Sequence, residues 1–193
     1  MRSPALNQRP SGSTGSTRKA GTARMRILGV DPGSQTTGYG VIDSDGRHYS
    51  LIEYAAIRVP PNLGFAERLL TISRRLEEVI ARLTPEACAV EETFYALNVQ
   101  SALKLGHVRG AILVCAARAG LQVFEYSALE IKSALVGYGR AEKRQVQEMV
   151  RVLLGLKSAP SPLDASDALA AAICHVNVAS THSRMGVRGP QDT

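Results

Sequence analysis

Apolar residues form five short runs that are typical of β-strands. The run at residues 27–30 is uninterrupted, which indicates a strand covered on both faces, because a covered strand needs no polar alternation. Residues 87–92, a short apolar run that ends on acid, and residues 121–126 are two more predicted strands. Two further β-rich segments, over residues 39–43 and 48–59, follow the first run across turn-forming residues. The first three strands are therefore predicted to form a meander.

Two longer segments repeat their apolar residues every three or four positions, which predicts amphipathic helices over residues 65–83 and 101–119. Helical patterns also occupy three later segments, at about residues 127–136, 142–156 and 163–178. Three strands, a helix, a strand, a helix, a strand and then helices make an α/β fold. We expect a five-stranded mixed sheet covered by helices on both faces.

The length of 193 residues predicts one domain rather than two. Residues 1–24 are rich in Ser, Gly, Thr, Pro and Arg, contain no acid, and have too few apolar groups to fold, so we expect a disordered basic leader. A transit peptide and a true start at Met25 are alternatives for this leader. The folded domain is expected over 25–178, followed by a flexible C-terminal tail over 179–193.

The remaining composition excludes a membrane protein and indicates a reducing compartment. No apolar run approaches the roughly 20 residues that span a bilayer. Cys88, Cys115 and Cys174 lie in apolar surroundings without paired spacing, so they are predicted to be buried, reduced thiols. We therefore expect a cytoplasmic protein with no membrane partner.

The net charge of +6 is unevenly distributed along the chain. The leader carries five basic residues and no acid, so the folded part is almost neutral. Within that part, residues 131–157 carry six bases against two acids. A basic face on a neutral domain is typical of a protein that binds a phosphate backbone, although a solvated helix surface gives the same pattern.

Acidic residues stand at the ends or starts of predicted core elements in three separate places. Asp31 ends the first strand before the turn at Pro32, and Glu91 with Glu92 ends the fourth. Asp164 and Asp167 open the last helix on one face. Capping a turn or a helix would explain Asp31 or Asp164 alone. Asp167 is harder to explain in this way, because its helix is otherwise almost wholly apolar and a buried lone carboxylate is costly.

Convergence of these acids would create a site for divalent cations. Glu91 and Glu92 point to opposite faces of their strand, so only one of them can join the others. Like charges about 4 Å apart repel by about 4 kcal/mol at an effective dielectric near 20, and a cation removes that repulsion. All-oxygen ligands favour Mg²⁺ or Mn²⁺.

Taken together, the blocks of sequence around these acids resemble the RuvC family of bacterial Holliday junction resolvases. The resemblance covers about residues 25–178, with every block in family order. The blocks are residues 29–33, 37–41, 90–94, 101–106, 123–126, 136–139 with 141–143, and 164–170.

The resemblance implies an RNase H-like fold, a homodimer, and an endonuclease that nicks two opposed strands of a four-way DNA junction during recombination and repair. It implies that Asp31, Glu91, Asp164 and Asp167 are the catalytic acids and hold two Mg²⁺ or Mn²⁺ ions. The expected products are a 5′-phosphate and a 3′-hydroxyl. Family members also work with the RuvA-RuvB branch-migration complex.

The resemblance further implies that Lys132 and Lys143 lie near the DNA and that Phe94 presses against bases at the crossover. Arg140 and Arg144 belong to the same basic stretch and are predicted to hold the backbone by charge. Each has a simpler alternative: Phe94 could be a hydrophobic staple before a helix, and the bases could be solvated surface. Glu92 is left as a surface or supporting group.

Other functions compete with this one. An actin-like or sugar-kinase-like ATPase also uses an Asp-x-Gly turn for phosphate, but it needs a second such turn, and Asp31-Pro32-Gly33 is the one in this chain. A junction-binding protein without catalysis would keep the bases and lose an acid. An RNase H-type nuclease of RNA–DNA hybrids would share the fold and the ions.

Overall fold

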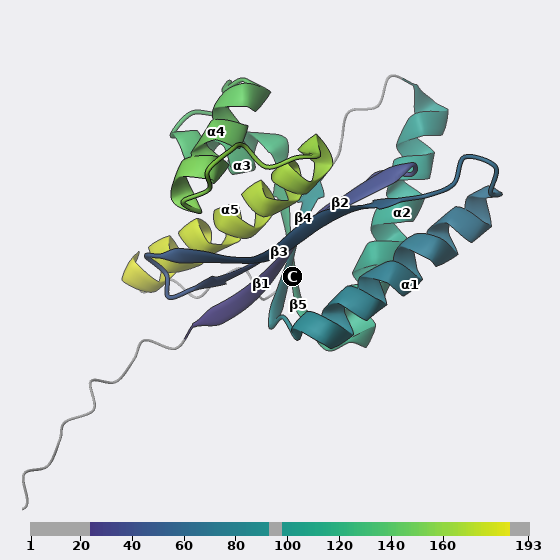
Figure 1. The fold of residues 1–193 in the computed structure, drawn as a ribbon, viewed down its shortest axis with the longest axis horizontal. Helices are drawn as coiled ribbons and strands as arrows, with labels where there is room; N and C mark the ends of the chain where they lie inside the picture. Colours follow the sequence, from purple (N-terminus) through teal and green to yellow (C-terminus); the bar gives the residue numbers. More distant parts are fainter. Residues whose placement is uncertain (1–23, 93–97, 186–193) are drawn as a thin grey trace, which may run out of the picture.

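The computed structural model describes residues 24–92 and 98–185 of the chain. Its centre is a five-stranded sheet with the strand order β3-β2-β1-β4-β5 (Figure 1). The first three strands form the predicted antiparallel meander, and β4 and β5 are added parallel to β1. The strands are β1 (Met25–Asp31), β2 (Thr36–Ser44), β3 (Tyr49–Arg58), β4 (Ala87–Glu92) and β5 (Gln122–Ser127).

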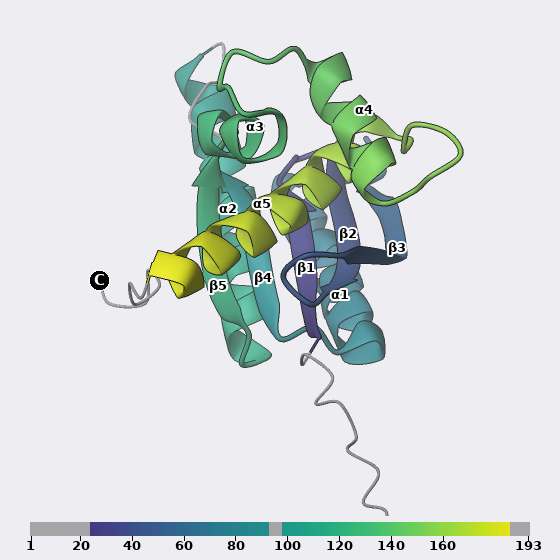
Figure 2. The ribbon, with the colours of Figure 1, turned by 90° about the vertical axis from the view of Figure 1, so that its left-hand side faces the viewer.

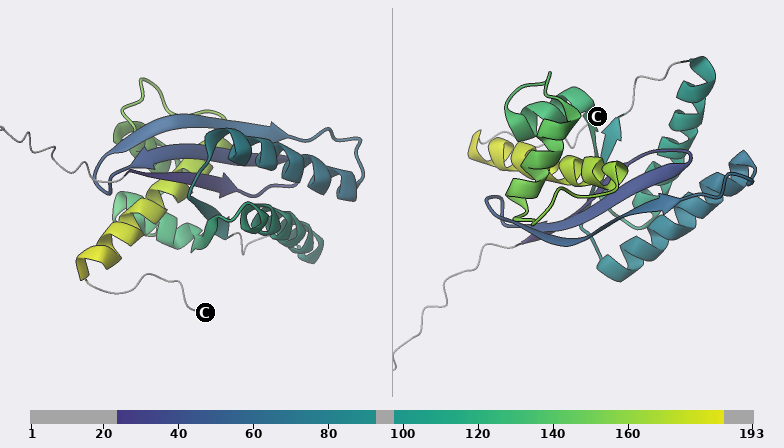
Figure 3. Two further views of the ribbon diagram at one scale, coloured as in Figure 1. Left: turned by 90° about the horizontal axis from the view of Figure 1, so that it is seen from below. Right: turned by 45° about the horizontal axis from the view of Figure 1, so that its top comes forward.

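Helices cover both faces of this sheet, as the sequence predicts. One apolar cluster joins the sheet to α1 and α2, and a second cluster on the other face joins it to α3, α4 and α5 (Figure 2). In the right-hand view of Figure 3, the sheet runs between α3, α4 and α5 on one side and α1 and α2 on the other. The helices are α1 (Phe65–Leu83), α2 (Val99–Arg118), α3 (Ala128–Val136), α4 (Lys143–Leu153) and α5 (Leu163–Met185).

Several helix ends differ from the sequence prediction, and local hydrogen bonds explain two of them. The helix expected at 101–119 begins at Val99, because the Asn98 side chain caps it by accepting a hydrogen bond from the Ser101 amide. Helix α4 ends at Leu153 rather than at 156, since Gly155 turns the chain with φ +62°. The last helix, expected to end at 178, runs to Met185 and so includes the first part of the expected C-terminal tail.

The predicted burial of the cysteines is confirmed, and two histidines also have structural contacts. All three cysteines are free and buried. His175 is also buried, where its Nδ1 is 2.8 Å from the hydroxyl of Tyr126. His107 packs edge-on against Phe65. Within the described ranges, no helix combines the length and apolarity needed to cross a membrane.

Helix α5 crosses the sheet at unusually close range because glycines face it. Figure 2 shows α5 crossing over β1 and β2. Gly29 of β1 and Gly38 and Gly40 of β2 leave room for it, since a Cβ atom at any of them would lie closer than 3.0 Å to the helix. A Cβ atom at Gly38 would overlap the carbonyl oxygen of Asp164, and one at Gly29 would overlap that of Ala168. At Gly29 and Gly38 the nearest helix atoms belong to the main chain, whereas at Gly40 they belong to the side chain of Leu169. This contact fixes the height of α5 above the strands.

Replacing Gly38 by Ala is expected to destabilise the protein by about 3 kcal/mol. The added Cβ atom would overlap the main-chain carbonyl oxygen of Asp164, and no change of rotamer relieves this overlap. Urea unfolding measures the loss. Gly106→Ala is the matched control: it lies in α2, where an added Cβ meets nothing within 4 Å, and it should be neutral or slightly stabilising. Equal effects of the two substitutions would contradict the close-contact interpretation.

Candidate active site

Two of the predicted acids lie at the ends of neighbouring parallel strands. The β1–β4 ladder pairs Val30 with Val90, so Asp31 and Glu91 are the next residues on each strand. Side chains alternate along a strand, and Val30 and Val90 both belong to the core on the α1 and α2 side. Asp31 and Glu91 therefore point to the face that α5 covers.

The other two acids arrive on the first turns of α5. Asp164 is held by the glycine contact, since its carbonyl lies against Gly38, and Gly38 pairs with Asp31 across the β1–β2 ladder. Asp167 lies one turn further along the same helix face. The fold thus brings together acids that are far apart in the sequence, as predicted for Asp31, Glu91, Asp164 and Asp167.

Burial and mutual repulsion raise the pKa values of three of these carboxyl groups, Asp31, Glu91 and Asp167. Burial is the main cause that raises the pKa of Asp31 to about 8, and the charges of Glu91, Asp167 and Asp164 raise it further. Burial and then Asp167 raise the pKa of Glu91 to about 7. The pKa of Asp167 is raised as well, again chiefly by burial. Near neutral pH the cluster therefore retains protons that ordinary surface carboxyl groups would release.

Two lysines offset part of this repulsion. The Nζ atom of Lys143, on the first turn of α4, lies 3.5 Å from Oδ2 of Asp167. Its charge lowers the pKa of Asp31, Glu91 and Asp167, and theirs raise the pKa of Lys143. Lys132 of α3 also lowers the pKa of Glu91 and Asp167. Both lysines line a cavity of about 100 Å³ together with Glu91 and Asp167.

The donor set fits hard divalent cations. All four groups are carboxylates, which are the ligands that Mg²⁺ and Mn²⁺ prefer. As the side chains stand, no three Asp, Glu, His or Cys groups within residues 24–92 and 98–185 surround one point that an ion could fill. The carboxylates would therefore have to turn toward each other on binding, which their mutual repulsion opposes until a cation is present.

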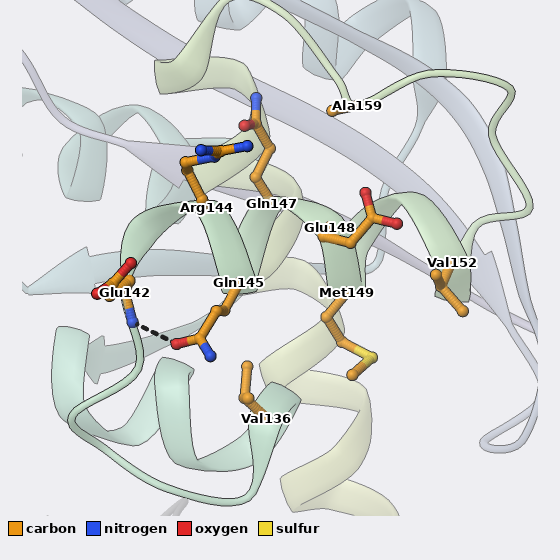
Figure 4. Close-up of a pocket in the computed structure, with 9 residues that line it drawn as sticks. All are labelled: Val136, Glu142, Arg144, Gln145, Gln147, Glu148, Met149, Val152 and Ala159. Carbon is orange, nitrogen blue, oxygen red and sulfur yellow. Dashed lines mark hydrogen bonds between the residues drawn. The ribbon is translucent and has the colours of Figure 1, made fainter.

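The remaining predicted DNA contacts are placed less closely. Arg140 is exposed in the turn between α3 and α4. Arg144 projects from α4 beside another cavity, of about 670 Å³, which is separate from the acidic cluster (Figure 4). Phe94 lies outside the described residues.

Glu92 takes the opposite side of β4 from Glu91, as the alternation predicts. There it accepts a hydrogen bond from Nη2 of Arg109 at 3.2 Å, and Nε of the same arginine donates to Glu125 at 2.5 Å. Arg109 and Glu125 were not predicted as site residues from the sequence. The contacts of Arg109 with Glu92 and Glu125 depend on the strand register and on the packing of α2, which the local sequence does not show.

Comparison with known proteins decides the family. The model of the family described as crossover junction endodeoxyribonuclease RuvC matches residues 27–175. The chain belongs to the RuvC family. A relative of the same description from Chloroflexus aggregans is 48% identical over 163 residues, which are 84% of this chain and 99% of the relative. Another, from Heliobacterium modesticaldum, is 53% identical over 150 residues, or 78% and 93% of the two chains.

Solved structures agree with this RuvC assignment. RuvC of T. thermophilus, determined in complex with a Holliday junction substrate, is 39% identical, with a TM-score of 0.77 over 84% of this chain and 96% of that one. The yeast mitochondrial Holliday junction resolvase Ydc2 is 12% identical, with a TM-score of 0.57 over 84% of each chain, and shows the shared fold alone. The expected RNase H-like architecture is confirmed.

Asp31→Asn should stabilise the protein in EDTA. A carboxyl group whose pKa is higher in the folded than in the unfolded state weakens folding as pH rises between the two values, here from about 4 to about 8. Removing that charge should therefore raise the free energy of unfolding, and by about 2 kcal/mol more at pH 8 than at pH 6. The measurement is urea unfolding at pH 6 and pH 8. Glu78→Gln, an exposed carboxylate on α1, serves as the control and should change neither value.

Proposed function

We infer that this chain resolves four-way DNA junctions by paired, symmetric nicks in two opposed strands, during recombination and repair. Membership of the RuvC family over residues 27–175 is the observation that carries this inference. The acidic cluster supports it, because Asp31, Glu91, Asp164 and Asp167 are all present and lie close together where the inner strands β1 and β4 end. The function also explains why basic side chains adjoin that cluster.

The four acids would hold two Mg²⁺ or Mn²⁺ ions. Such ions generate an attacking hydroxide and stabilise the oxygen that leaves phosphorus, so hydrolysis gives a 5′-phosphate and a 3′-hydroxyl. The contribution of the protein is the placement of the ligands. Asp31 is held by its pairing with β2 and Glu91 by its pairing with β5, while Asp164 and Asp167 are held by the docking of α5.

DNA would approach over the ends of α3 and α4, where the basic residues lie. Lys132 and Lys143 adjoin the acids and are suited to the phosphates beside the cut. Arg140 and Arg144 would extend this contact along the backbone, which makes binding weaker as salt rises. Phe94 follows β4 in the chain, and we propose that it contacts bases at the crossover.

Paired nicks require two active sites, so we propose a homodimer. Its partners would be four-way junction DNA and the RuvA-RuvB branch-migration complex. A DNA substrate and three reduced, buried cysteines favour a cytoplasmic location.

The decisive experiment compares cleavage of a synthetic four-way junction, a linear duplex and an RNA–DNA hybrid, each with Mg²⁺, Mn²⁺ or EDTA. Symmetric nicks in the junction alone, lost in EDTA and in Asp31→Asn, are the expected result. Asp31→Asn should still bind the junction, because the basic residues are unchanged. Binding without cutting by the wild-type protein would indicate a non-catalytic junction binder, and cutting of the hybrid alone would indicate an RNase H-type enzyme.

Lys143→Ala should slow cleavage of the junction and weaken binding. Loss of one phosphate contact should reduce the slope of log Kobs against log salt by about one. Loss of the ammonium group should also shift the cleavage pH profile upward, since Lys143 lowers the pKa of three acids. Lys157→Ala, an exposed lysine in the loop after α4, is the matched control. Identical salt slopes and pH profiles for the two variants would remove Lys143 from the site.

A further inference from the structure

Arg109 of α2 links the carboxyl ends of two adjacent strands. Its guanidinium donates to Glu125 of β5 at 2.5 Å and to Glu92 of β4 at 3.2 Å. All three side chains are about 70% buried, with exposed fractions of 31%, 30% and 25% for Arg109, Glu125 and Glu92. A guanidinium that is shared by two partly buried carboxylates holds both in a defined geometry. We call these three residues the Arg109 clamp.

The clamp acts where β4 loses one of its neighbours. The ladder with β1 ends at the pair Val30–Val90, whereas the ladder with β5 continues through Glu91 and Glu92. The last two residues of β4 therefore pair with β5 alone. A strand end with one neighbour is prone to fraying. The Arg109 clamp adds a side-chain link at this end, on the face turned toward α2.

Glu91 is the residue directly before Glu92 and points to the opposite face. Fixing the side chain of Glu92 on the α2 face fixes the peptide plane that joins the two residues, and with it the direction of the Glu91 side chain. Glu91 is thereby kept beside Asp31 and Asp167, with which it interacts.

We propose that Arg109 is a positioning residue for the metal site, which acts on Glu91 through Glu92. The proposal rests on the inferred function, since it assigns Glu91 as a metal ligand. Arg109 itself touches neither the acidic cluster nor the DNA-facing lysines, because it lies on the other side of the sheet. Mutation of a residue that orients a metal ligand without binding the metal commonly lowers metal affinity by about 10-fold to 100-fold.

The action of Arg109 is geometric rather than electrostatic. Two carboxylates on its own face neutralise its charge, and the bases whose charges bear on Glu91 are Lys143 and Lys132. Loss of Arg109 should therefore weaken cation binding without moving the pH profile of cleavage. Loss of Lys143, by contrast, should move that profile. This difference separates the two kinds of residue.

The test measures Mn²⁺ binding by electron paramagnetic resonance of the free ion, with the whole protein and no DNA. Arg109→Met should raise the Mn²⁺ concentration for half-saturation about tenfold. Arg75→Met is the matched control: it removes an arginine that pairs with Glu78 at 2.9 Å on the exposed surface of α1, and it should bind Mn²⁺ as the wild type does. Glu92→Ala should reproduce the effect of Arg109→Met. Glu92→Gln keeps an oxygen acceptor for Arg109 and should restore most of the affinity.

Three further measurements define the outcomes. Melting temperature in EDTA and junction binding in EDTA should stay at wild-type values in Arg109→Met and Glu92→Ala, and the cleavage pH profile should keep its shape. Wild-type Mn²⁺ affinity in both variants would overturn the proposal. A lowered melting temperature with unchanged Mn²⁺ affinity in the folded fraction would also overturn it, since the clamp would then be structural only. If the wild-type protein binds Mn²⁺ but cuts no junction, the inferred function fails while the role of Arg109 is still decided by the binding data.

Discussion

The close contact between α5 and the first two strands is the constraint on which the site depends. Gly29, Gly38 and Gly40 leave no side chains under the helix; the main chain of α5 fills the space at Gly29 and Gly38, and the side chain of Leu169 fills it at Gly40. The height of the helix above the sheet is therefore set by main-chain atoms, which cannot adjust by changing rotamers. Because Asp164 and Asp167 are rigid parts of that helix, their distance from Asp31 and Glu91 follows from the packing and not from loop geometry.

This arrangement carries an electrostatic cost that the rest of the site moderates. Four acids lie together where the inner strands β1 and β4 end, and there burial and repulsion raise the pKa of Asp31, Glu91 and Asp167. Lys143 offsets some of this repulsion at 3.5 Å from Asp167, but one ammonium group cannot balance the whole cluster. The folded protein tolerates this repulsion because the glycine contact and the two apolar clusters supply favourable packing. The contact that fixes the height of α5 is also the one that places Asp164 in the acidic cluster.

Most of the fold and the acidic cluster could be predicted from the sequence, for physical reasons. Uninterrupted apolar runs specify buried strands, and an Asp such as Asp167 in an almost wholly apolar helix needs a partner. The end of α5 could not be predicted, because residues 179–185 are mostly polar and carry no apolar period. The Arg109 clamp was also missed, since ion pairs between elements depend on the register and on the packing of α2. Neither is visible in local sequence. The expected roles of Phe94 and of the leader stay predictions.

The order of the elements along the chain also has a consequence for synthesis. Asp31 and Glu91 belong to strands made early, whereas Asp164 and Asp167 are on α5, the last element that the structure describes. A nascent chain that has formed its sheet but not yet α5 lacks half of the acids. The glycines of β1 and β2 are then not covered by that helix. Docking of the final helix closes the core and completes the acidic cluster in one step. A chain that lacks α5 therefore has only Asp31 and Glu91 of the four clustered acids.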